Sequence, residues 1–314
     1  MNLLRVILVF LFFSAYCGFA QPYVDLINFN NQRVQTNYVD SFGGNEKINN
    51  FAVNLTVPIK LDSQNTIILR LFTEHLVAST DVGVNERVPF TNVVSNQKLS
   101  YVTSLYATIL PFGLQRESKN KKWKYLVLAM PKVAGTLGEK VSSYNFQPGV
   151  FALVTHKYSD QLSIKGGLFY NKEFFGNFLV PIISADWTVS DRFKMYGTFP
   201  TFYKFEYAVK KQMVYAGLNY RSYTRSFLIS GAEHNYMRID DMSVKAFVDV
   251  YIKKNIVLYA EFGRMINYSL LDYKYNTKPK PENEITNSVV YRTTEIPFFF
   301  NIGMAYRLRF DFDK

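Results

Sequence analysis

Apolar and polar positions alternate near the end of the chain. From Ile296 to Phe310 every even-numbered position is apolar, and the odd-numbered positions are mostly small or polar, with Phe299 as the exception. Successive side chains of a β-strand point to opposite faces, so the pattern predicts a strand with one apolar and one polar face. The run is longer than the roughly 9–11 residues that a tilted strand needs to cross a bilayer. We therefore expect a strand with one face toward lipid and the other toward water.

The same alternation recurs along most of the chain. In residues 243–252, Val248 falls on one face, whereas Lys245 and Asp249 fall on the other. Counting such segments predicts about 14 strands, or about 12 if the weak segments around Pro200 merge. The expected strands are 21–39, 47–60, 66–78, 98–110, 122–131, 147–157, 162–171 and 179–189, three strands within 193–236, and then 243–252, 256–268 and 296–310.

Short, turn-like connections alternate with long, polar ones. The short ones are 62–65, 158–161, 190–192 and 253–255, and the long ones are 79–97, 132–146 and 269–293. Bacterial transmembrane barrels have short turns at one end and long loops at the other. The sequence therefore predicts an all-β fold, a single antiparallel up-and-down transmembrane β-barrel of about 12–14 strands, with the long loops outside the cell. The alternative is a soluble secreted β-protein, whose apolar face would point inward.

The first 20 residues have the pattern of a secretory signal peptide. Arg5 precedes an apolar run over residues 6–13, and small residues stand at Gly18 and Ala20. We expect cleavage after Ala20, which leaves residues 21–314 as one barrel domain. Two alternatives are an uncleaved membrane anchor, for which the apolar run is short, and lipidation of Cys17.

Composition narrows the chemistry of the mature chain. Cys17 is the only cysteine, so cleavage removes any disulfide, thiol nucleophile or cysteine metal site. The 28 Phe and 23 Tyr residues suit the aromatic girdles of a membrane barrel. The net charge of +11 does not gather in a basic helix or a recognised motif, so we expect no nucleic-acid partner. Attraction to anionic head-groups fits better, and the expected partners are outer-membrane lipid and lipopolysaccharide.

Together these features resemble the Gram-negative outer-membrane β-barrel proteins, and the layout is similar to uncharacterised barrel families of unknown function. The closing strand over residues 301–312 carries the resemblance, because in that class the barrel-assembly machinery recognises alternating apolar residues with aromatics near the end. Tyr306, Leu308 and Phe310 match that pattern, although the chain ends on Asp313-Lys314 and not on an aromatic residue. The resemblance implies the cell outer membrane as location and the assembly machinery as partner, and it leaves the oligomeric state open.

The sequence offers little for catalysis. The three histidines are His75, His156 and His234, and the pairs Glu74-His75 and Glu233-His234 are adjacent in sequence. Neighbours on a strand point to opposite faces, so neither pair forms a dyad. Nucleophile elbows, metalloprotease helices, phosphate loops and calcium loops are all missing from the sequence. We expect a non-enzymatic protein with no catalytic residue, no metal site and no cofactor; the alternative is a lipid-modifying outer-membrane hydrolase.

Charged residues on the predicted inner face are the candidate site. They either pair across a filled interior or line a wet pore and tune its selectivity. Positive members outnumber negative ones, which predicts a mild preference for anions. The function expected is therefore either a passive channel for small solutes or a closed barrel that acts through its surface loops. The candidate lumen-lining residues are Arg70, Glu74, Lys98, Lys165, Lys245, Asp249, Glu261, Arg307 and Arg309.

Overall fold

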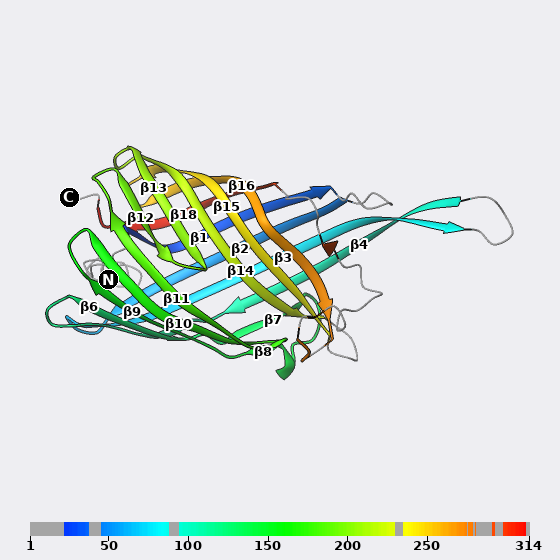
Figure 1. The fold of residues 1–314 in the computed structure, drawn as a ribbon, viewed down its shortest axis with the longest axis horizontal. Coiled ribbons are helices and arrows are strands. Elements are labelled where there is room, and N and C mark those ends of the chain that lie inside the picture. The colour runs from blue at the N-terminus through cyan, green and yellow to red at the C-terminus, as the bar shows by residue number, and fades with distance from the viewer. Residues whose placement is uncertain are drawn as a thin grey trace, which may run out of the picture.

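The chain folds into one closed β-barrel (Figure 1). The computed structural model describes residues 22–37, 45–87, 94–229, 235–274, 276–278, 280, 291–292 and 298–311. The expected signal peptide, His234 and most of the 269–293 connection lie outside these residues. The described part contains no helix long and apolar enough to span a membrane.

The wall consists of 18 strand segments that form 14 antiparallel barrel strands. The first nine segments are β1 (Tyr23–Asn37), β2 (Asn45–Lys60), β3 (Asn65–Arg87), β4 (Val94–Ile109), β5 (Phe112–Glu117), β6 (Trp123–Ala129), β7 (Lys132–Thr136), β8 (Phe146–Gln147) and β9 (Gly149–Lys157). The others are β10 (Leu162–Glu173), β11 (Gly176–Thr188), β12 (Phe193–Thr198), β13 (Phe202–Lys210), β14 (Val214–Leu228), β15 (Tyr236–Lys253), β16 (Ile256–Tyr273), β17 (Tyr291–Arg292) and β18 (Phe298–Arg309). A short 3₁₀ helix, η2 (Ser143–Asn145), precedes β8.

Three neighbouring barrel strands are each interrupted by a proline. Pro111 separates β4 from β5, Pro131 separates β6 from β7, and Pro148 separates β8 from β9. Proline has no N–H to donate, so the ladder breaks at each of them. Their carbonyls still accept bonds from adjacent strands: Arg70 N to Pro111 O at 2.8 Å, Leu110 N to Pro131 O at 3.0 Å and Lys172 N to Pro148 O at 2.9 Å. The three prolines therefore form a row across the wall.

The barrel closes between its first and last strands. β1 pairs with β2 on one side and with β18 on the other, in a register that begins at Tyr23↔Arg309. β1 therefore starts, and β18 ends, at the end of the barrel that carries the short turns (Figure 1). The predicted fold class is confirmed, and the three strands expected within 193–236 are β12, β13 and β14.

Parts of the predicted long connections are strand instead. Residues 79–87 and 94–97 extend β3 and β4 into a hairpin that projects beyond the wall at the right of Figure 1. Residues 132–136 form β7, and residues 269–273 belong to β16. The prediction was wrong at these places because cross-strand hydrogen bonds continue through polar sequence, which the apolar alternation does not detect.

The outer face of the barrel is the apolar one. On β15, Val248 is 43% exposed whereas Lys245 is 1% exposed. On β18, Phe300 and Ile302 are exposed and Asn301 between them is buried. This arrangement is the reverse of what the soluble alternative requires. Arg264 interrupts the outer face near the long-loop end, where its guanidinium carbon lies 4.5 Å from the centre of the Phe298 ring.

The hairpin of β12 and β13 is shorter than its neighbours. β11 pairs with β12 only at Trp187↔Met195 and Thr188↔Lys194, whereas β10 and β11 pair along twelve residues. On the other side, the pairing of β13 with β14 ends at Phe202↔Arg221. In Figure 1, β11 and β14 continue toward the long-loop end beyond the tip of this hairpin, and there Ser226 Oγ of β14 accepts from Phe174 N at 3.3 Å, at the turn before β11.

Beyond the short hairpin, β14 turns toward the opposite wall. Leu228 forms a parallel bridge with Gly135 of β7, and Thr136 Oγ1 donates to Leu228 O at 3.3 Å. Ser226 Oγ accepts from Gln147 of β8 and donates to Glu173 of β10. Contacts across the interior thus narrow the lumen at the long-loop end.

Candidate functional site in the barrel lumen

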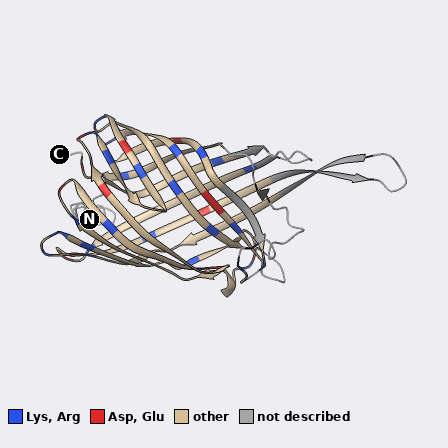
Figure 2. Ribbon diagram, viewed as in Figure 1, with Lys and Arg blue, Asp and Glu red and all other residues tan. Residues whose placement is uncertain are grey.

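Oppositely charged side chains pair on the inner face, between adjacent and next-nearest strands, in the half with the short turns. Lys245 Nζ lies 3.3 Å from Glu261 Oε2, and Asp249 Oδ2 accepts from Arg307 Nη1 at 2.6 Å and from Lys204 Nζ at 3.0 Å. All five side chains are buried. A buried charge is costly unless it is paired, so these contacts neutralise most of the basic inner face. Figure 2 shows basic and acidic residues interspersed over the same strands.

Further pairs extend the network to both ends. Arg309 pairs with Glu206 and Asp311, Lys165 with Asp186, Lys132 with Glu173, and Arg225 with Glu74 and Asp241. Arg307 also pairs with Asp25, at 2.5 Å. The Arg225–Glu74 and Arg309–Glu206 pairs join strands that are not neighbours in the wall, whereas Lys165–Asp186 and Arg307–Asp25 join adjacent strands.

The lumen is apolar toward the long loops. A buried cluster there takes one or more residues from β1, β2, β3, β4, β7, β14, β15, β16 and β18. Leu105 and Phe227 are fully buried in it, and Leu76 and Phe299 nearly so. The cavity beside this cluster, bordered by Leu76, Arg225 and Asp241 among others, measures about 10 Å³, which is at most one water molecule. Side chains therefore fill the lumen at this level.

Two inner-face arginines differ from the rest. Arg70 of β3 and Arg221 of β14 form no hydrogen bond or ion pair with any residue in the described part of the chain, although Arg225, Arg307 and Arg309 all do. Arg70 shares its face with Glu74 yet is exposed, so solvent reaches it inside the barrel. The guanidinium carbon of Arg221 lies 5.2 Å from the centre of the Tyr223 ring, and Arg70 interacts electrostatically with the same tyrosine.

An apolar patch covers the inner wall formed by β6, β9 and β10, in the short-turn half of the barrel. Cross-strand register places Leu126 beside Leu153 and Leu128 beside Phe151, and Phe151 in turn beside Phe169. These residues share a face with the buried Lys165, so they point inward. All but Leu128 are only half-buried. The lumen thus combines free guanidinium groups with an apolar wall.

The predicted lumen residues fall into three groups. Lys165, Lys245, Asp249, Glu261, Arg307 and Arg309 are buried on the inner face in ion pairs. Glu74 is buried against Arg225, whereas Arg70 stands apart from every pair. The side chain of Lys98 lies outside the described part.

Sequence reasoning missed Lys204, Glu206, Arg221 and Arg225, because the boundaries of the strands within 193–236 were not fixed. The odd-numbered polar positions from Asn219 to Arg225 carried the signal.

The two described histidines lie on the outer face. His75 Nε2 is 2.7 Å from Ser104 Oγ, and Glu74 points into the lumen. The His156 ring lies 4.2 Å from the Trp123 ring, centre to centre. No cluster of His, Cys, Asp and Glu within the described residues has the arrangement of a metal site.

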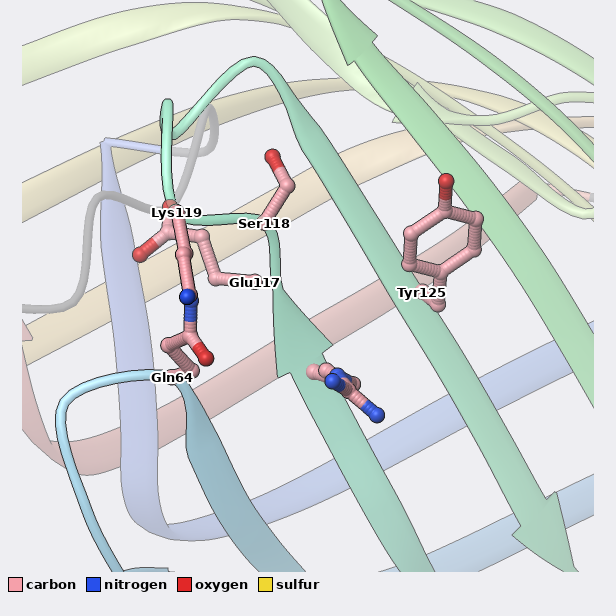
Figure 3. Close-up of a pocket in the computed structure, with 6 residues that line it drawn as sticks. Gln64, Glu117, Ser118, Lys119 and Tyr125 are labelled. Atoms are coloured by element: carbon pink, nitrogen blue, oxygen red, sulfur yellow. The ribbon is translucent and has the colours of Figure 1, made fainter.

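A polar recess of about 560 Å³ lies at the short-turn end, between the 61–64 turn and the β5–β6 turn (Figure 3). Gln64, Arg116, Lys119 and Tyr125 are among its lining residues. Asp62 holds the adjacent turn: its side chain accepts from Asn65 Nδ2 at 2.7 Å and from the backbone N–H groups of Gln64 and Asn65. These bonds lower the pKa of Asp62. The recess belongs to the turn surface and is separate from the lumen.

Residues 98–307 match a protein family described as Domain of unknown function (DUF6268). The chain belongs to this family. The matched segment includes Arg221 and most of the paired charges, whereas Arg70 lies before it. No curated protein matches the chain.

Solved structures that align with most of this chain include a channel, a translocator domain and a porin. The COG4313 outer membrane channel from Pseudomonas putida F1 has 10% identity and a TM-score of 0.37, over 90% of this chain and 94% of that one. The translocator domain of autotransporter NalP from Neisseria meningitidis has 9% identity and a TM-score of 0.31, over 97% and 94%. The NanC porin has 7% identity and a TM-score of 0.32, over 90% and 100%. Scores this low support no transfer of function.

Proposed function

We propose that the protein is a non-enzymatic integral outer-membrane barrel that holds small anionic solutes in its lumen and is gated, not permanently open. The apolar outer face supports the membrane location. One observation carries the solute class: Arg70 and Arg221 have neither ion pair nor hydrogen bond among the described residues, in a lumen whose other arginines are neutralised.

A free guanidinium is suited to a carboxylate or a phosphate, because its N–H groups match two oxygens at once. The paired cations are not available in this way, since Lys245 and Arg307 already face Glu261 and Asp249. Any anion preference therefore comes from Arg70 and Arg221, and not from the excess of positive residues in the sequence.

The gate is the apolar cluster at the long-loop end. It reaches across the lumen from β3 and β4 to β14 and β18, and the cavity beside it measures about 10 Å³. An ion that passed between these packed apolar side chains would lose its hydration shell, which is strongly unfavourable. We expect passage along the barrel axis only when this cluster opens.

Planar-bilayer recording tests the proposal. The wild-type protein should be nearly silent, whereas the Phe227→Ala/Phe299→Ala variant should give steady single-channel steps that favour chloride over potassium. Adding Arg70→Gln and Arg221→Gln should move the reversal potential toward zero. Heat-modifiable migration on gels checks that each variant is folded. The proposal would be overturned by large single-channel conductance steps from the wild-type protein. It would also be overturned if the Phe227→Ala/Phe299→Ala variant showed no preference for anions.

Location and orientation belong to the same proposal. We propose that a cleaved signal peptide sends residues 21–314 to the outer membrane, that the assembly machinery acts through the closing strand, and that the long loops face outside. A tag inserted near Lys280 should then bind antibody on intact cells; binding only after the membrane is ruptured would reverse the orientation.

A lipid-modifying hydrolase is the second candidate, because His75 and Ser104 are hydrogen-bonded on the lipid-facing side. A serine hydrolase also needs a group that orients the histidine, and no carboxylate is hydrogen-bonded to His75 in the described structure. Release of fatty acid from phosphatidylethanolamine vesicles that stops on Ser104→Ala would favour this candidate over the first.

A further inference from the structure

The wall of the barrel has one seam where the backbone ladder is nearly absent. β11 and β12 share two residue pairs. Farther toward the long-loop end, the backbone contact across the seam is the hydrogen bond from Ile183 N to Phe199 O, at 3.3 Å. Unpaired backbone groups are very unfavourable in the hydrocarbon of a membrane, so an edge of this kind must be covered. The seam is therefore the weakest line in the described wall.

Side chains replace the missing ladder. Gly197 O accepts from Lys165 Nζ at 3.0 Å and from Ser184 Oγ at 3.1 Å, and Gly197 N donates to Asp186 Oδ1 at 3.1 Å. On the β11 side of the seam, the Ala185 carbonyl accepts a hydrogen bond from Tyr203 Oη of β13 at 2.7 Å. Side-chain bonds can be exchanged by rotating a side chain, whereas a ladder must be unzipped along its length. The seam can therefore open with little change to the rest of the wall.

Pro181 stands at the edge that such an opening exposes. Ile183 N points away from β10 and toward Phe199, and residues two apart on a strand point the same way. The missing N–H of Pro181 thus lies on the open edge, where it leaves no donor unsatisfied. Within sheets, proline is found mainly on edge strands, at the first residue of a strand or at bulges, because it cannot donate a hydrogen bond to the ladder.

The seam connects with the apolar inner patch. Ile182 of β11 lies beside Gly167 of β10, which lies beside Leu153 of β9 and so continues the patch to the strand edge. Arg221 is the last residue of β14 that pairs with β13, so a free guanidinium lies on the opposite side of the seam. The route along the axis is blocked at the same time, by the apolar cluster and by the bridge from Leu228 to Gly135.

We propose that the seam between β11 and the β12–β13 hairpin is a lateral passage between the lumen and the bilayer, and that its cargo is a single-chain amphipathic anion. This inference rests on the proposed function and specifies its solute. The carboxylate or phosphate head binds Arg70 and Arg221, and the alkyl chain lies on the half-buried patch of Leu126, Phe151, Leu153 and Phe169.

A reversible cross-link tests the passage. In a Cys17→Ser background, Ile183→Cys and Phe199→Cys place two thiols on residues joined by a hydrogen bond across the seam. The matched control is Ala216→Cys/Val248→Cys, on directly paired residues of β14 and β15 where the ladder is complete. Each protein is placed in phosphatidylcholine nanodiscs and mixed with chain-end spin-labelled dodecanoate, dodecyl phosphate or dodecanol.

The reduced Ile183→Cys/Phe199→Cys protein should immobilise the anionic probes. Oxidation should slow the rate of immobilisation by about tenfold or more, and adding reductant should restore the rate. The control should bind at the same rate oxidised or reduced. Dodecanoate and dodecyl phosphate together distinguish a carboxylate from a phosphate cargo. Arg70→Gln/Arg221→Gln should reduce occupancy by the anions and leave that of dodecanol unchanged.

The inference fails if oxidation of the seam leaves the rate unchanged, or if dodecanol is held as well as the anions. Failure of the proposed function is separate, because it is measured by the reversal potential of Phe227→Ala/Phe299→Ala in planar bilayers. A barrel that prefers chloride there but does not immobilise the lipid probes would overturn the lateral passage alone.

Discussion

The two halves of the lumen differ in the side chains that line them. The half near the short turns is lined by ion pairs such as Lys245–Glu261, whereas the half near the long loops is filled by side chains such as Leu105 and Phe227. Ion pairs hold only while both partners keep their charge and position, but apolar packing depends on volume alone. One barrel can therefore combine a layer whose stability depends on matched charges with a layer whose stability depends on how closely its side chains pack.

Charge reversal in the paired half should give the largest effect. Lys245→Glu places a second buried carboxylate beside Glu261, so it removes an attraction and adds a repulsion. Loss of one partner from a buried pair costs about 3–5 kcal/mol, and the reversal should reach at least that range. Urea unfolding in detergent measures it. The swapped pair Lys245→Glu/Glu261→Lys should recover much of the loss, and no recovery would mean that the two residues are not coupled.

In the apolar half, a cavity should have a smaller effect that depends on volume. Leu105 is fully buried, and Leu105→Ala should reduce the free energy of unfolding by about 2–5 kcal/mol. Leu105→Met should cost less than about 1.5 kcal/mol, because the volume is nearly kept. The same urea measurement applies to both variants, and equal losses would show that the cluster is not tightly packed.

Two arginines sharpen the comparison between paired and free charge. Arg225→Gln leaves Glu74 and Asp241 without their cation and should destabilise the barrel by about 1.5–3 kcal/mol. Arg70→Gln removes no ion pair and should change stability by less than about 0.5 kcal/mol. Urea midpoints measured side by side decide the point. A larger loss at Arg70 than at Arg225 would contradict the assignment of Arg70 as free.

The smallest expected effect on stability concerns Asp62, which lies at the 61–64 turn outside the lumen. The hydrogen bonds to Asp62 lower its pKa in the folded state, so its contribution to stability is present above the unfolded pKa of about 3.9 and is lost as pH falls through the folded value. Because Asp62 is at the exposed turn, the loss should be slight. The urea midpoint from pH 6 to pH 3 should fall slightly less in Asp62→Asn than in wild type; identical profiles would mean that the turn bonds do not couple to folding.

The wall was predictable from sequence, but the closure of its interior was not. Alternation at Val248 and Lys245 identifies the two faces of β15, because a strand has a fixed period of two. Whether Lys245 meets Glu261 or open water depends on which strands face each other and on their stagger, which no local pattern contains. For the same reason, the sequence could not show that Arg70 lacks an ion pair. The carboxylate nearest to it in sequence, Glu74, is paired with Arg225 of β14.

The row of Pro111, Pro131 and Pro148 has a mechanical consequence. A sheet that bends sharply loses hydrogen bonds at the bend, but a proline has no N–H bond to lose and contributes only its carbonyl. The wall can therefore fold along this row at a lower energetic cost than along any line of complete ladder. The row lies between Leu105, Ala107 and Ala134 on one side and the inner patch on the other. We expect the wall to bend along this row, so that movement of the β3–β4 hairpin reaches the apolar cluster through Leu105 and Ala107 of β4.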